Sequence, residues 1–172
     1  MYGGILTVME ELKVSKVIIS KQYENSENYR RFEQIVKDKK IKVKAVAKGD
    51  KLTIERNLYF DILWPNNERL ISENALNNNS IVCKLIYNNF SMIFTGDIEE
   101  IAEKEMLKEY KKDLGILSSH VLKVAHHGSK TSSIKEYIDA VNPKLALIGV
   151  GENNKFGHPN EEVIMRLKNK RY

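Results

Sequence analysis

The sequence contains a single cysteine, Cys83, so no disulfide can form within the chain. Cys83 lies in the alternating segment Ile81–Leu85, a pattern typical of a strand with one buried face. We therefore predict a buried thiol with a structural role, because free cysteine packs as a small apolar side chain. The use of cysteine gives no information about the cellular compartment.

Long apolar runs and sequence repeats are absent as well. No run reaches the roughly 18–20 residues of a membrane-spanning helix, and no signal-peptide pattern opens the sequence. The chain by itself is therefore expected to be soluble. Low-complexity tracts and linkers are also missing, and 172 residues with 42% hydrophobic content are enough for one domain with a sizeable core.

Basic residues outnumber acidic ones, and the formal net charge is +5. An excess of this size suits a polyanionic partner such as nucleic acid, but it is also common on ordinary solvated surfaces. Charge alone leaves both interpretations open.

Hydrophobic periodicity predicts an α/β fold with layered sheets and outer helices. Helices are expected over residues 5–12, 27–39, 99–110, 133–141 and 161–168, and strands over residues 17–20, 42–46, 51–54, 59–64, 80–87, 91–95, 122–125 and 145–148. Asn88-Asn89 predicts a hairpin turn, and Ser132 or Ser133 is expected to cap the helix that follows. The apolar run 145–148 predicts a buried strand.

Polar side chains follow three of the predicted strands. Thr95-Gly96-Asp97 ends one strand, His126-His127-Gly128-Ser129 ends the next, and Phe156-Gly157-His158-Pro159 forms a later loop. Each motif alone has a simple structural explanation, such as a turn, a solvated loop or a helix cap. In this order, carboxylate and imidazole groups at strand ends indicate a metal site or an acid–base site.

These motifs closely resemble the metallo-β-lactamase superfamily. Within it they are most similar to the C-terminal hydrolase domain of the ComEC/Rec2 family, the DNA-uptake proteins of competent bacteria. Gly3-Gly4 near the start and Asn79-Ser80 before the hairpin fit the same domain. The similarity extends over nearly the whole chain, and the His-His-Gly-Ser stretch is its most specific part.

The resemblance implies a partial αββα sandwich of two mixed sheets with outer helices and a metal site at the edge between them. The implied cofactor is a divalent metal, Zn²⁺ or Mn²⁺, with two ions in the intact family. The bound water of such a metal has a pKa near 7 and can attack a phosphodiester.

The family pattern also assigns roles to individual residues. Asp97 is the expected bridging carboxylate, and one of the two paired histidines is the expected metal ligand. Of the two we favour His126, because it directly follows its strand, and the choice between His126 and His127 stays open. His127 and His158 are the expected catalytic residues, contacting substrate and stabilising the leaving group. Ser129 and Lys130 are expected to bind substrate.

One part of the family pattern is missing from the sequence. The main metal motif of the superfamily, His-x-(His/Asp)-x-Asp-His, precedes the Gly-Gly pair, and here only Met1-Tyr2 stand before Gly3. The resemblance therefore predicts a single domain over residues 1–172 that lacks the N-terminal strands of the family and this motif.

Three functions follow from the resemblance. The first is a nuclease segment that degrades the non-transported DNA strand during natural transformation, attached in the intact protein to an inner-membrane channel on its extracytoplasmic side. The second is an inactive domain that binds partners or self-associates through exposed sheet edges. The third is a hydrolase of another phosphoester or of a lactone. Lys123, Lys130 and Lys155 favour a phosphate-rich substrate, although lysines are abundant throughout.

Overall fold

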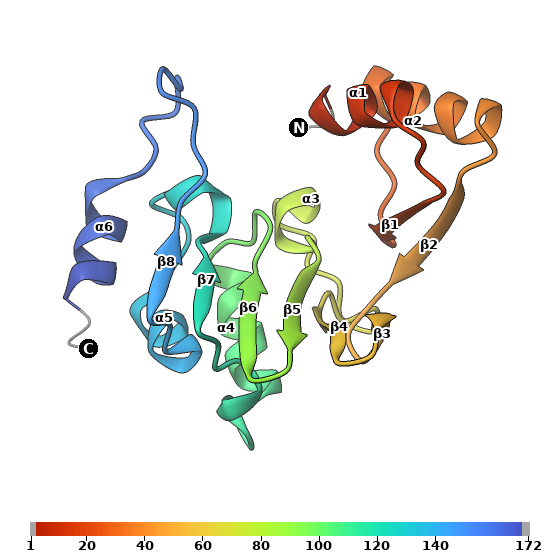
Figure 1. Cartoon of the computed structure of the whole chain (residues 1–172). Coiled ribbons are helices and arrows are strands. Elements are labelled where there is room, and N and C mark those ends of the chain that lie inside the picture. The colour runs from red at the N-terminus through yellow and green to blue at the C-terminus, as the bar shows by residue number, and fades with distance from the viewer. Residues whose placement is uncertain (1–2, 170–172) are drawn as a thin grey trace. The chain divides into compact units, whose positions relative to one another are not determined.

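The computed structural model describes residues 3–169, and the chain divides into two compact units, Met1–Val46 and Ala47–Tyr172. Each unit has its own sheet and helices (Figure 1). The predicted α/β class with two sheets is therefore confirmed. The single-domain interpretation stays a prediction, and Met1-Tyr2, where it places the start of the truncated domain, lie outside the described residues.

The first unit is a parallel pair of strands with two helices. Its elements are α1 (Gly3–Glu11), β1 (Lys16–Ser20), α2 (Glu27–Asp38) and β2 (Lys42–Val46). Ser26 caps α2 by accepting a hydrogen bond from the Tyr29 backbone N–H. The apolar sides of both helices meet β1 in a small buried cluster, composed of Leu6, Met9, Val17, Phe32, Ile35 and Ile41.

The second unit is built on a six-stranded sheet in the order β3-β4-β5-β6-β7-β8. Its strands are β3 (Lys51–Glu55), β4 (Leu58–Trp64), β5 (Val82–Tyr87), β6 (Phe90–Phe94), β7 (Val121–Lys123) and β8 (Leu145–Leu147). The first four strands pair antiparallel, with the predicted Asn88-Asn89 turn between β5 and β6, whereas β6, β7 and β8 are parallel. No helix among residues 3–169 is long and apolar enough to cross a membrane.

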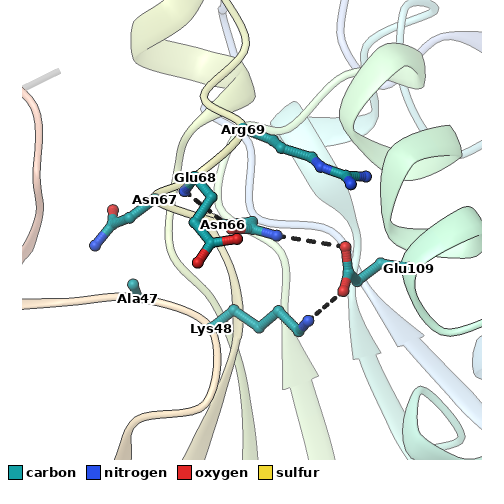
Figure 2. A pocket seen from close by; sticks show the side chains of 7 residues that line it. All are labelled: Ala47, Lys48, Asn66, Asn67, Glu68, Arg69 and Glu109. Carbon is teal, nitrogen blue, oxygen red and sulfur yellow. Dashed lines mark hydrogen bonds and ion pairs between the residues drawn. The ribbon is translucent and has the colours of Figure 1, made fainter.

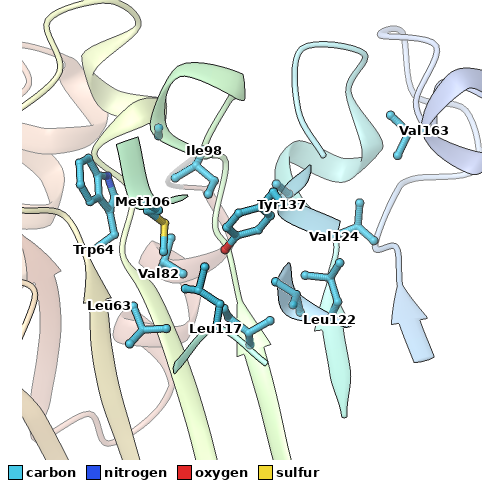
Figure 3. Close-up of a cluster of buried hydrophobic side chains, with 14 residues drawn as sticks. Leu63, Trp64, Val82, Ile98, Met106, Leu117, Leu122, Val124, Tyr137 and Val163 are labelled. Atoms are coloured by element: carbon cyan, nitrogen blue, oxygen red, sulfur yellow. The ribbon is translucent and has the colours of Figure 1, made fainter. Parts of the chain in front are cut away.

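Helices connect the parallel strands, as parallel pairing requires. Their bounds are α4 (Glu100–Glu109) between β6 and β7, and α5 (Lys135–Val141) between β7 and β8. The remaining helical elements are α3 (Ala75–Asn78), α6 (Glu161–Lys168) and the short 3₁₀ turns η1 (Leu114–Ile116) and η2 (Ala125–Gly128). The core of this unit joins the strands to α4, α5 and α6 through Trp64, Leu122, Met106, Tyr137 and Val163 (Figure 3).

Parallel strands place their carboxyl ends at one edge of a sheet. Asp97 follows β6 and His126 follows β7, so the topology brings the two predicted motifs to the same edge. The prediction of a strand up to Ala125 is wrong at its end, because β7 stops at Lys123. The chain turns there, and the His126 N–H donates to the Gly96 carbonyl at 3.0 Å.

The predicted serine cap of α5 is also wrong. The residue at the cap position is Ile134, which has no capping side chain, and Ser133 adopts a left-handed φ of 59°. The segment just before the helix is instead held by Glu103 of α4, whose carboxylate oxygens accept from Ser133 N at 2.6 Å and from Ile134 N at 2.8 Å. A buried carboxylate from a neighbouring helix therefore fixes the chain at the entry to α5, where no side chain caps the first turn.

Strand β8 is not buried, contrary to the prediction from its apolar run. It is the last strand of the sheet, and Leu145 and Leu147 are 52% and 42% exposed. Periodicity cannot distinguish a central strand from an end strand, because both can be continuously apolar.

Cys83 lies in β5 and is half-buried. Burial raises the pKa of the thiol to about 11, so the reactive thiolate is scarce at neutral pH. This agrees with the predicted structural role.

Candidate functional site

The loop after β6 requires glycine at its first turn. Gly96 has a φ of 55°, and a Cβ there would lie 2.7 Å from the Ser80 Cβ. Next to it, Thr95 Oγ1 donates to the Lys123 carbonyl at 2.6 Å, which ties the ends of β6 and β7 together. The Asp97 N–H donates to Ser80 Oγ at 3.3 Å. The carboxylate of Asp97 is thus carried on a tightly fixed backbone at the sheet edge.

The paired histidines lie in an unusual backbone turn. His126, His127 and Gly128 have φ angles of 47°, 56° and 79°, so three consecutive residues are left-handed. For a non-glycine residue this conformation costs of order 1–3 kcal/mol, and such strain is concentrated at functional sites. Hydrogen bonds on both sides hold the turn, including Asn160 N to the Gly128 carbonyl at 2.8 Å.

This turn directs the two imidazoles at two different carboxylates. His127 Nε2 lies 3.6 Å from Asp97 Oδ1, and His126 Nδ1 lies 3.4 Å from Glu99 Oε1. Adjacent residues of a regular strand would instead point to opposite faces. The site therefore consists of two carboxylate–imidazole pairs side by side.

Glu99 is a site residue that the sequence analysis missed. Its carboxylate is nearly buried and accepts hydrogen bonds from Asn74 Nδ2 at 2.8 Å and from Thr131 Oγ1 at 3.1 Å. Its own N–H donates to Asn78 Oδ1 at 3.0 Å. The available signal was its position two residues after Asp97, but in the sequence that position also suits the start of a helix, where acidic residues are common.

The geometry of the two pairs suits a divalent metal. Two ligand atoms at 2.0–2.1 Å from a tetrahedral zinc lie about 3.4 Å from each other, close to both carboxylate–imidazole distances. His127 Nδ1 lies 2.6 Å from the Gly149 carbonyl, which can only accept, so Nδ1 carries a hydrogen and Nε2 is the ring nitrogen directed toward Asp97. His126 Nδ1 is buried and has no hydrogen-bond partner among residues 3–169.

These residues supply only part of the ligand set that a metal ion needs. Among residues 3–169, no three His, Cys, Asp or Glu side chains are grouped closely enough to hold a metal by themselves. The expected ligands Asp97 and His126 are at the same edge, but the imidazole nearest Asp97 is that of His127. The division of roles between the two histidines stays a prediction.

His158 joins the same cluster from the loop before α6. Its ring lies 5.8 Å from the His126 ring, edge to face at 63°. Burial, and then the neighbouring His126 and His127, lower the pKa of His158, while Asp97 acts in the opposite direction. These effects together favour the uncharged form of the His158 ring. Asn160, rather than His158, caps α6 through its side-chain oxygen.

The two residues expected to bind substrate differ in exposure. Ser129 is buried, and its hydroxyl lies 3.0 Å from Thr131 Oγ1, which in turn donates to Glu99. Lys130 is exposed. Lys123 is half-buried behind the edge, and burial lowers the pKa of its ammonium while Asp97 raises it. The substrate roles of Ser129 and Lys130 stay predictions.

A polar cavity of about 350 Å³ is lined by a different set of residues, none of which belongs to the predicted site (Figure 2). Lys48 and Glu109 form an ion pair across it, and Asn66 Nδ2 donates to Glu109. Glu109 therefore has its carboxylate occupied by neighbours, and these contacts lower its pKa.

The sequence is similar to segments of several known bacterial proteins. No protein-family model matches the sequence. It is 31% identical to ComE operon protein 3 of Bacillus subtilis over 96% of this chain and 20% of the relative. It is 32% identical to competence protein ComA of Neisseria gonorrhoeae over 63% of this chain and 15% of the relative. Recombination protein 2 of Haemophilus influenzae is 30% identical over 96% of this chain and 18% of the relative.

The chain thus spans a fifth or less of the length of these relatives. Two of the three matches cover nearly all of its residues, including the Thr-Gly-Asp, His-His-Gly-Ser and Gly-His-Pro motifs. The chain is therefore a homologue of one segment of these competence and recombination proteins.

Proposed function

We propose that this chain forms part of a metal-dependent phosphodiesterase centre in a DNA-uptake protein of competent bacteria. The observation that carries the proposal is the pair of carboxylate–imidazole contacts, 3.6 Å for Asp97–His127 and 3.4 Å for Glu99–His126, at one sheet edge. Similarity to competence proteins supports DNA as the substrate.

A divalent metal bound here would supply a water of lowered pKa as the nucleophile. The residues of the chain would position that metal. The side chain of Asp97, which ends in a carboxylate, is only 12% exposed. The Gly149 carbonyl fixes the ring of His127 so that its Nε2 faces the Asp97 carboxylate. His158, whose uncharged form is favoured because its pKa is lowered, can accept a proton beside the reacting group.

Catalytic zinc sites commonly use three protein ligands and one open position. The described residues offer no cluster of three, so we place the remaining donors outside them. Imidazole favours Zn²⁺, whereas the two carboxylates also suit Mn²⁺. Both metals therefore belong in the test.

Cleavage of a labelled single-stranded DNA oligonucleotide by the chain tests this function. We expect slow cleavage with Mn²⁺ or Zn²⁺ and none with EDTA. His127→Ala should reduce the rate at least about 10-fold, since even groups behind a metal ligand contribute this much. His120→Ala is the matched control, because His120 precedes β7 at the opposite edge and bonds Ser91; it should leave the rate unchanged. Cleavage that is indifferent to EDTA and to His127→Ala would contradict the proposal.

A second candidate function is self-association through β8. The outer edge of this strand has no neighbour in the described sheet, and its two leucines are half exposed. An exposed apolar end strand is a template for pairing with another chain. A dimer that binds no metal and cleaves no DNA would favour this function over the first.

A further inference from the structure

Phe156 is the most exposed large apolar side chain that the structure describes, at 82%. It lies in the loop between β8 and α6, two residues before His158. A single exposed apolar residue needs no functional explanation by itself. The position of this one is distinctive because its ring is held against a residue of the candidate site.

Asn154 fixes the loop that carries Phe156. Its Oδ1 accepts from the N–H groups of Phe156 at 3.2 Å and His158 at 3.0 Å. Its Nδ2 donates to the His158 carbonyl at 2.7 Å and to the Gly151 carbonyl at 3.2 Å. One side chain thus closes the loop on itself, and the exposed ring is presented on a set backbone.

The Phe156 ring stacks on His158 with centroids 5.8 Å apart and planes only 17° from parallel. The His158 ring is in turn 5.8 Å from that of His126. Three rings therefore form a row that begins in solvent and ends at the Glu99–His126 pair. The outer end of this row is a flat aromatic surface a few side chains from the proposed site of hydrolysis.

We propose that Phe156 is a stacking platform for an unpaired nucleobase of a single-stranded nucleic acid, and that it positions the strand at the His126–Asp97 edge. The identity of the ligand rests on the proposed function. A nucleobase suits the ring because every base has a flat π face, and stacking on aromatic side chains is the usual means of holding single strands. In a duplex these faces are already covered by neighbouring bases. Lys155, exposed and adjacent in sequence, supplies a cation for the phosphate that accompanies the base.

The chain contains a matched control for this arrangement. Phe90 stacks on His120 with centroids 6.0 Å apart and planes at 14°. Phe90 begins β6 and His120 precedes β7, so this pair is at the edge opposite the candidate site. Phe90 is 42% exposed. The two pairs have nearly the same stacking geometry but differ in location and in the exposure of the phenylalanine ring.

The test is equilibrium binding of a fluorescent single-stranded oligonucleotide to the chain, in EDTA and at one fixed salt concentration. Phe156→Ala should weaken binding about 5- to 150-fold, the range for loss of one base stack. Phe156→Trp should retain binding, and Phe90→Ala should leave it unchanged. An abasic oligonucleotide of the same length should bind wild type and Phe156→Ala equally. Thermal unfolding of Phe156→Ala should match wild type, because the ring is mostly in solvent.

Equal binding of the ordinary oligonucleotide by wild type and Phe156→Ala would overturn the inference, as would failure of wild type to bind it. A Phe156→Ala loss of the same size with the abasic strand would also overturn it, because the contact would then not be to a base. The binding experiment is done in EDTA, without metal, so its result does not depend on whether the chain hydrolyses DNA. Base-dependent binding without cleavage refutes only the proposed function, and cleavage that is unaffected in Phe156→Ala refutes only the stacking role.

Discussion

Replacing Asp97 by asparagine is expected to reduce metal-dependent cleavage more than about 100-fold, because groups that merely support a metal ligand already contribute 10- to 100-fold. Asparagine keeps the shape of the side chain and removes the charge that a divalent metal needs. The backbone should be unaffected, since the loop is held by the Asp97 N–H on Ser80 and by Thr95 on Lys123. The measurement is the cleavage rate at saturating metal, together with thermal unfolding.

Asp139→Asn is the control for this change. Asp139 lies on the surface of α5 and pairs with Lys135 one helical turn away, so its loss should leave cleavage unchanged. Full activity in Asp97→Asn, with the fold intact, would remove Asp97 from the site and with it the central pair of the proposal.

Glu103→Gln is expected to remove a pH dependence of stability. Burial raises the pKa of Glu103 to about 7 from 4.5, although the Ser133 and Ile134 N–H groups and Arg166 act in the opposite direction. The folded protein therefore holds a proton that the unfolded chain releases between pH 4.5 and 7. Stability from this group is fully present below pH 4.5 and is lost as pH rises through 7. The shift corresponds to about 3 kcal/mol at 1.36 kcal/mol per unit.

The measurement is the free energy of unfolding by urea from pH 4 to pH 8. The wild type should lose about 3 kcal/mol relative to Glu103→Gln over this range. The variant should also carry a pH-independent loss of about 1–3 kcal/mol, because its amide oxygen can accept only one of the two buried N–H groups in the same way. Glu105→Gln, on the exposed side of the same helix and paired with Lys108, is the control. Parallel pH profiles for wild type and Glu103→Gln would show that the pKa of Glu103 is the same in the folded and unfolded states, and would contradict this prediction.

Local patterns predicted most elements of this fold. Alternation located β4, β5 and β6, and helical spacing located α2, α4 and α6 within about two residues. What local patterns could not reveal were partnerships across the chain. The segment that enters α5 is held by Glu103, some thirty positions earlier, and the apolar run of β8 is exposed because no further strand follows it in the described sheet. Both depend on tertiary packing, which is not encoded in a short window.

The candidate site was predictable only in part, because local motifs were visible in the sequence but contacts between distant residues were not. The Gly-Asp and His-His-Gly motifs marked strand ends, and parallel pairing brought them together. The sequence could not assign each imidazole its carboxylate, because that depends on the left-handed turn at His126 and His127. Glu99 was missed because its importance arises from burial among Asn74, Asn78 and Thr131, none of which carries a catalytic signature.

The four histidines of the chain allow the most direct test of the proposed metal edge. His126, His127 and His158 belong to the candidate site, and His120 lies at the opposite edge of the same sheet. The measurement is the NMR spectrum of the imidazole ring protons as substoichiometric Mn²⁺, which broadens nearby signals, is added to the chain. The account predicts that the signals of His126, His127 and His158 broaden first while that of His120 stays sharp, and that Asp97→Asn abolishes the difference. Equal broadening of all four signals, or none, would contradict it.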